Sequence, residues 1–339
     1  MHSTNIFRKR HPHSLAALTS AALLHMLLSL TPHSASAQSE AYPVKPVRII
    51  VPFSAGGGTD TIARVLAQKL TEAWSQSVIV ENRPGAGGAI GIDAVLKAPA
   101  DGYTLGIGTI STLAIGPATQ VKPRYDALAD FAHVTLVSTV PYNIVAHPSL
   151  PARTLGEFVR LARSKPLLLN YGSAGYATGT HLTAEYFSSV TGVKMVHVPY
   201  KGDAPALIDL LSGHITAGFF TMTLMTQHIL SGKLRGLAVM SPQRSPKLPN
   251  VPTVAESGYP GFASQSWQGV SLRAGVPPEI VRKLSTDLTR ILSMAEVRNA
   301  IEAGGNTVAP GSPEDYERFI TSEIAKWKKV ITSAGIRIQ

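Results

Sequence analysis

Residues 47–60 of the chain read VRIIVPFSAGGGTD. The β-branched run from Val47 to Val51 is typical of a buried strand. The three glycines predict a tight turn, and Thr59 or Asp60 is suited to cap the helix that follows. In an α/β sheet such a turn lies at the carboxyl ends of the strands, where ligands bind. The stretch therefore predicts an α/β fold with a ligand site at this turn.

A second segment, residues 169–181, repeats this plan and reads LNYGSAGYATGTH. Both segments pass from a strand through Ser-Ala-Gly to a polar residue that opens a helix. Free backbone N–H groups and the helix dipole at such a turn favour an anion. One glycine-rich turn is weak evidence, because glycine shapes tight loops everywhere. Two matched turns without Lys or Arg predict a two-sided anion clamp made of backbone and hydroxyl donors.

Strands and helices alternate outward from these turns. Residues 78–80 and 103–107 are expected to be strands on either side of a helix ending near Val95, in a right-handed parallel βαβ arrangement. Residues 154–157 form a capping box that opens another helix. We predict two α/β lobes, with the helical tail returning to cover the first. The remaining expected strands are 143–146, 167–171, 195–198, 216–220 and 237–240, and the expected tail helices are 277–294 and 312–335.

The first 37 residues have the pattern of a secretory signal peptide. Basic residues 8–10 precede an apolar run, residues 15–30, and Ser34-Ala35-Ser36-Ala37 offers an Ala-x-Ala cleavage site. The apolar run is short for a membrane span. We expect cleavage after Ala37 and export to the periplasm; an uncleaved N-terminal anchor is the alternative.

The composition of the chain excludes several classes of function. The 339 residues suffice for two domains, and the formal net charge of +10 suits small anions at most. Nucleic acid is not an expected partner, because no nucleic-acid motif occurs and the one basic run of the mature chain is Lys328-Lys329. The chain has no cysteine. Disulfides, thiolate metal sites, a Cys nucleophile and a lipid-anchoring Cys are therefore excluded.

Motifs for enzymatic chemistry are missing as well. Neither Ser54 nor Ser173 lies in Gly-x-Ser-x-Gly, and no glycine loop is followed by Gly-Lys-Ser/Thr. Residues 85–90 break the dinucleotide pattern at its last glycine. His181 and Glu185 have no third metal ligand nearby and are expected to be a surface pair. We therefore predict a protein that is not an enzyme and that uses no metal and no cofactor.

Several longer motifs carry a family resemblance. They are PVKPVR (43–48), ENRPGAGG (81–88), DGYTL (101–105), VPYKG (198–202), PNVPTVAE (249–256) and SWQG (266–269). Together with residues 52–64, they resemble the Bug family, the receptors of the tripartite tricarboxylate transporters. The likeness covers residues 42–339.

This resemblance implies a periplasmic-binding-protein fold of the second type, with a ligand cleft between two α/β lobes. Lobe 1 would comprise residues 42–140 and 261–339, and lobe 2 residues 141–260. The resemblance further implies a monomer that binds a dicarboxylate, a tricarboxylate or a small aromatic acid and delivers it to membrane permease subunits. A receptor that presents its ligand to a sensor kinase is the alternative.

Site residues follow from the same resemblance. Thr221-Met222 stand where many relatives carry Asp-Asn, which removes a carboxylate that an amino-acid ammonium would need. This departure favours a plain or more apolar acid over an amino acid. The expected ligand-binding residues are Phe53, Ser54, Gly57, Gly58, Asp60, Thr109, Ser111, Thr112, Ser173, Ala174, Gly175, Thr178, His181 and Thr221.

Overall fold

A computed structural model describes residues 1–2, 42–119 and 123–336 of the chain. The chain divides into two units, Met1–Ala41 and Tyr42–Gln339. The predicted signal peptide and its cleavage site lie outside the described residues.

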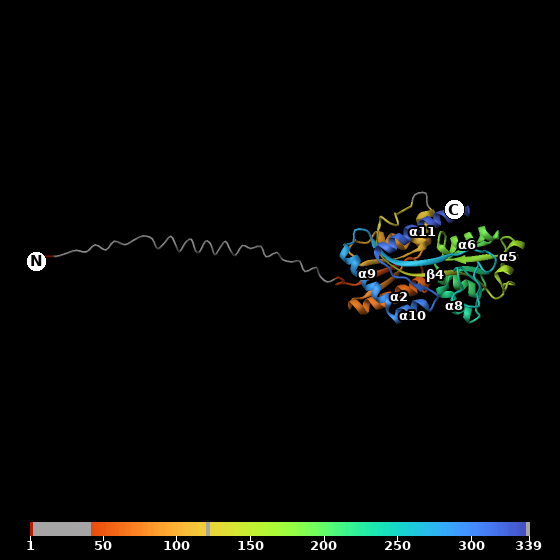
Figure 1. Ribbon diagram of the computed structural model, residues 1–339, viewed down its shortest axis with the longest axis horizontal. Helices are drawn as coiled ribbons and strands as arrows, with labels where there is room; N and C mark the ends of the chain where they lie inside the picture. The colour runs from red at the N-terminus through yellow and green to blue at the C-terminus, as the bar shows by residue number, and fades with distance from the viewer. Residues whose placement is uncertain (3–41, 120–122, 337–339) are drawn as a thin grey trace. The chain divides into compact units, whose positions relative to one another are not determined.

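One ten-stranded sheet organises this unit (Figure 1). Its main path runs β2-β1-β3-β9-β4-β7-β5-β6, and β8 and β10 both pair with β4. The non-sequential order means that the chain crosses back and forth between elements, as the α/β prediction requires. The strands are β1 Val47–Val51, β2 Val78–Asn82, β3 Thr104–Thr109, β4 Phe131–Ala146, β5 Asn170–Ser173, β6 Val196–Pro199, β7 Ala217–Thr221, β8 Arg235–Val239, β9 Gln265–Arg273 and β10 Thr307–Val308.

The predicted βαβ unit is present at one end of the sheet. Strand β1 pairs in parallel with both β2 and β3. Helix α2 (Gly58–Trp74) connects β1 to β2 and buries Ile62, Leu66 and Leu70. These side chains pack with Val47 and Ile49 in one apolar cluster. The glycine-rich turn therefore stands at the carboxyl end of β1, as expected.

Strand β4 is much longer than the predicted extended segment at 143–146. Its first part, Phe131–Pro141, pairs antiparallel with β9. Its last part, Tyr142–Ala146, pairs antiparallel with β7. One strand thus belongs to two different sets of neighbours, because its partner changes at Tyr142.

The second glycine-rich turn lies in the part of the sheet where β4 pairs with β7. Strand β5 pairs in parallel with β6 and β7, and the turn follows β5 directly. Helix α6 begins right after the turn. The helices of the unit are α2 Gly58–Trp74, α3 Ala89–Leu96, α4 Gly116–Thr119, α5 Leu155–Ser164, α6 Gly179–Thr191, α7 Asp203–Leu211, α8 Met222–Leu230, α9 Pro278–Ser293, α10 Ala295–Glu302 and α11 Pro313–Ser333. A 3₁₀ turn, Ala86–Gly88, and a π-helical segment, Ile110–Ile115, complete the set.

The helical tail packs against the elements formed early in the chain. Leu284 and Leu288 of α9 share a cluster with β1 and α2. Tyr316 and Trp327 of α11 share another with the π-helical segment. Trp267 of β9 belongs to this second cluster, and its Nε1–H donates to Glu323 Oε2 of α11 at 3.0 Å.

None of the helices in the described part of the chain is both long and apolar enough to cross a membrane.

Candidate functional site

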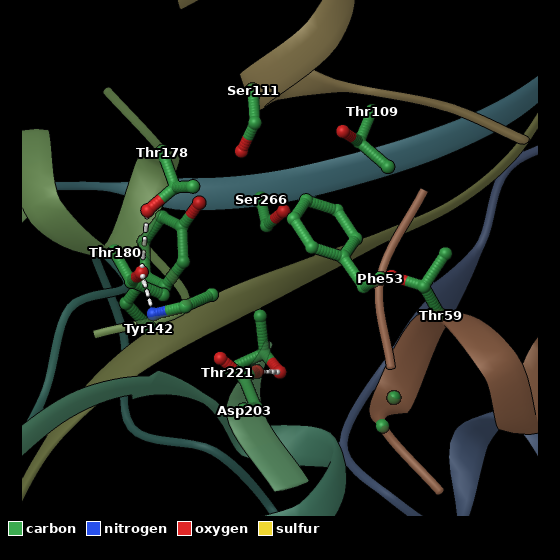
Figure 2. Close-up of a pocket in the computed structure, with 13 residues that line it drawn as sticks. Phe53, Thr59, Thr109, Ser111, Tyr142, Thr178, Thr180, Asp203, Thr221 and Ser266 are labelled. Atoms are coloured by element: carbon green, nitrogen blue, oxygen red, sulfur yellow. Dashed lines mark hydrogen bonds between the residues drawn. The ribbon is translucent and has the colours of Figure 1, made fainter. Parts of the chain in front are cut away.

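A narrow cleft of about 40 Å³ opens where the two glycine-rich turns meet the exits of several strands (Figure 2). Hydroxyl groups dominate its lining. The described residues that line the cleft include no Lys or Arg, and Asp203 is the acidic residue among them. The lining residues are Phe53, Gly57, Gly58, Thr59, Thr109, Ser111, Tyr142, Ala174, Thr178, Thr180, Asp203, Thr221 and Ser266.

The first turn presents an open helix N-terminus to the cleft. Gly57, Gly58 and Thr59 line the cleft at the start of α2. No side chain of the described residues caps this end of the helix. Since the first N–H groups of a helix have no partner inside it, they are available to an anion.

Asp60 holds this turn from behind and does not line the cleft. Its carboxylate accepts hydrogen bonds from the Gly56 N–H at 2.9 Å and from Asn82 Nδ2 at 3.0 Å. Arg64 Nε donates to it at 2.9 Å. Burial opposes ionisation of Asp60, but these hydrogen bonds outweigh it and hold the pKa below its ordinary value. Asp60 therefore fixes the shape of the turn as a carboxylate.

The second turn is closed by its own hydroxyl groups. The Ala174 N–H donates to Thr180 Oγ1 at 2.9 Å, and the Gly175 N–H donates to Ser173 Oγ at 3.1 Å. Thr178 caps α6 by accepting from the His181 N–H at 3.4 Å. The expectation of free N–H groups is therefore wrong for Ala174 and Gly175. Thr178 and Thr180 line the cleft, and the Thr178 hydroxyl donates to the Gly175 carbonyl at 2.6 Å.

Two hydrogen bonds join segments that approach the cleft from different strands. The Ser54 N–H, after β1, donates to the Lys201 carbonyl, before α7, at 3.1 Å. The Gly179 N–H, at the start of α6, donates to Ser111 Oγ, after β3, at 3.0 Å. The first approach requires glycine at 202, where φ is +143° and a Cβ would lie 2.6 Å from Ser54 Oγ.

The predicted site residues divide into two groups. Six of them lie behind the cleft lining: Ser54 and Asp60 support the first turn, Ser173 and Gly175 close the second, and Thr112 caps the segment after β3 through Thr109. His181 is the sixth and is described next. Those that line the cleft are Phe53, Gly57, Gly58, Thr109, Ser111, Ala174, Thr178 and Thr221.

His181 is buried and stacks on His197, with ring centroids 4.0 Å apart and planes 7° from parallel. The prediction of a surface pair with Glu185 is therefore wrong for His181, whose Nε2 lies 3.9 Å from Glu185 Oε1. Burial lowers the pKa of His181 to about 4. Burial, with repulsion from His181, lowers the pKa of His197 to about 3. Both rings are neutral at neutral pH, and Ser173 Oγ lies 2.6 Å from His197 Nε2. The stack supports the second turn.

Sequence reasoning missed Thr59, Tyr142, Thr180, Asp203 and Ser266. Thr59 and Thr180 lie within the two glycine-rich turns, directly beside predicted site residues. Tyr142 and Ser266 lie on β4 and β9, and only the strand pairing brings them here. Asp203 directly follows the VPYKG motif, at the start of α7, and this adjacency was its one signal in the sequence.

The model of the tripartite tricarboxylate transporter family receptor matches residues 62–336. The protein BugT of Bordetella pertussis is 36% identical over 319 residues, which cover 94% of this chain and 98% of BugT. The structure of the R. palustris protein Rpa4515 with adipate has a TM-score of 0.84 and 36% identity, covering 87% of this chain and 99% of that one. The structure of the periplasmic binding protein BugD has a TM-score of 0.85 and 33% identity, covering 88% and 100%.

Proposed function

This chain belongs to the receptor family of the tripartite tricarboxylate transporters, and on that premise we propose that its cleft captures a small carboxylate for delivery to the membrane permease subunits of such a transporter. The family consists of periplasmic solute-binding proteins of mixed α/β fold. The ligand class we propose includes dicarboxylates, tricarboxylates and small aromatic acids.

The observation that carries the proposal is the uncapped N-terminus of α2 at Gly57, Gly58 and Thr59. Unpaired N–H groups and the positive end of the helix dipole favour a carboxylate there. Hydroxyls of Thr109 and Ser111 supply further donors at the same cleft. An anion held by neutral donors and not by a buried salt bridge can be released, as a transport receptor must do.

We further propose that the two parts of the sheet act as lobes that close on the ligand, residues 42–140 with 261–339 and residues 141–260, in a monomer. The change of partner of β4 at Tyr142 supports this division, because pairing with β9 ends there and pairing with β7 begins. The chain passes between the two parts at that point.

A panel of carboxylates tests the proposed function through thermal unfolding. A ligand present at a hundred times its Kd stabilises the fold by ~2.7 kcal/mol. For a protein of this size, that raises the melting temperature by several degrees. We expect this shift with at least one member of a panel of C4 to C7 dicarboxylates, their 2-amino analogues, tricarboxylates and aromatic acids.

The matched control for each acid is its amide, which keeps the shape and removes the negative charge. We expect the amides to leave the melting temperature unchanged. A panel in which no carboxylate shifts the transition, or in which amides act as well as acids, contradicts the proposal.

Export is tested by the N-terminus of the mature protein. We expect the chain recovered from a periplasmic extract to begin at Gln38, because Ala35 and Ala37 form the Ala-x-Ala pattern that signal peptidase cleaves after its second small residue. Intact-mass spectrometry of the extract measures this directly. Recovery of the chain from the membrane fraction with Met1 to Ala37 retained contradicts it and supports the uncleaved anchor.

A further inference from the structure

Asp203 places a carboxylate in the cleft with one oxygen unused. Its Oδ2 accepts a hydrogen bond from Thr221 Oγ1 at 2.9 Å (Figure 2). Its Oδ1 is buried and has no hydrogen-bond partner among the described residues. A buried oxygen of this kind is costly unless a donor reaches it. The side chain lines the cleft, so a ligand is in a position to supply that donor.

No charged group of the described cleft lining pairs with Asp203, so a ligand can supply the donor for Asp203 Oδ1. Tyr142, from β4, is the other titratable group of the lining, and burial raises its pKa far above the ordinary value, so it stays neutral. Thr221, from β7, adds a neutral hydroxyl. The adjacent Lys201 is exposed. Within the described cleft lining, no cation balances the carboxylate.

The two sides of the cleft therefore attract opposite charges. The N-terminus of α2 favours an anion, whereas Asp203 favours a cation or another strong donor. In Figure 2, Asp203 and Thr221 lie across the cleft from Ser111. A plain dicarboxylate would bring a second negative charge toward a buried one, which is unfavourable at short range. A ligand with one positive group would satisfy Asp203 Oδ1.

We propose that the solute is an amino-carboxylate, whose carboxylate binds at the α2 turn and whose ammonium binds Asp203 Oδ1. This inference rests on the proposed function of the cleft as a carboxylate site. It reverses the expectation drawn from Thr221-Met222: the carboxylate missing at position 221 is supplied by Asp203, which is hydrogen-bonded to Thr221 itself.

The test compares each C4 to C7 dicarboxylate with its 2-amino analogue by calorimetry at pH 7.5. We expect the amino analogue of the best-binding pair to bind at least tenfold more tightly to the wild-type protein. Asp203→Asn keeps the size of the side chain and removes the charge. It should abolish this preference by weakening the amino analogue at least tenfold, while the plain acid binds as well as before or better.

A second readout is pH. Burial raises the pKa of Asp203 to about 6, with the Thr221 hydrogen bonds opposing the shift. The charged form that attracts an ammonium is therefore present above pH 6 and lost below it. Affinity of the wild type for the amino analogue should fall about tenfold between pH 7.5 and pH 5. In Asp203→Asn this fall should disappear.

Asp209→Asn is the control variant, since Asp209 lies on the same helix, bonds Tyr200 and does not line the cleft. It should keep the wild-type preference and pH dependence. If plain acids bind the wild type at least as tightly as their amino analogues, this inference is overturned and the proposed function stands. If neither series binds, both are overturned. The wild-type comparison decides the matter even if Asp203→Asn does not fold.

Discussion

Gly57→Val should lower carboxylate affinity by at least a hundredfold, ~2.7 kcal/mol, while the protein remains folded. Gly57 has φ −79° and ψ 168°, an extended conformation that any residue adopts. A Cβ at this position meets nothing closer than the Ser54 carbonyl oxygen at 3.4 Å, an ordinary contact. The backbone therefore accepts valine without strain. The branched side chain instead occupies the space beside the open N–H groups of α2 and keeps a carboxylate away from them.

The measurement is calorimetry with the acid that gives the largest thermal shift, together with circular dichroism. Gly156→Val is the matched control, because Gly156 lies in the first turn of α5, away from the cleft, and a Cβ there meets only Arg160 Nη1 at 3.6 Å. The control should bind like the wild type. Unchanged affinity in Gly57→Val would remove the first turn from the site.

Trp267→Ala should destabilise the protein by about 4 kcal/mol, the usual range for truncating a fully buried tryptophan. Trp267 is buried, and it packs edge-on against Tyr316 and Phe319 of α11. The substitution leaves a cavity between β9 and α11. It also takes the indole donor from Glu323 Oε2, which is buried.

Urea unfolding of three proteins separates these two causes. Trp267→Phe retains most of the apolar volume and loses the N–H donor, so it should cost about 1 to 3 kcal/mol. The difference between the Ala and Phe variants then reports the cavity. A cost below about 1 kcal/mol for Trp267→Ala would mean that this contact does not hold α11 to the sheet.

Local patterns in the sequence predicted the elements that have a strong local cause. Both glycine-rich turns lie where they were expected, because a β-branched run followed by glycines and a helix cap leaves little choice of structure. The capping boxes at Thr154 and Ser312 begin α5 and α11. The family resemblance fixed the fold class, which the comparisons confirm.

The remaining strands and site residues could not be predicted, because they depend on pairing between segments far apart in the sequence. The first part of β4 and the whole of β9 were not predicted as strands, because their identity depends on pairing with each other across more than a hundred residues of chain. Tyr142 and Ser266 were missed as lining residues for the same reason. His181 was misplaced because its burial depends on stacking with His197, which comes from β6. Neither contact leaves a local pattern.

The hydrogen bonds from Ser54 to Lys201 and from Gly179 to Ser111 affect the solute concentration at which this receptor fills. Each joins a segment of one proposed lobe to a segment of the other without using the ligand, so under that proposal they favour the closed arrangement by themselves. The apparent Kd of such a protein equals its intrinsic Kd divided by the fraction of molecules that are already closed. A side chain at Gly202, whose Cβ would lie 2.6 Å from Ser54 Oγ, would therefore weaken the first bond and raise the solute concentration at which the receptor fills. Because Gly202 does not line the cleft, the preference among solutes should stay the same. The working range and the selectivity then depend on different residues.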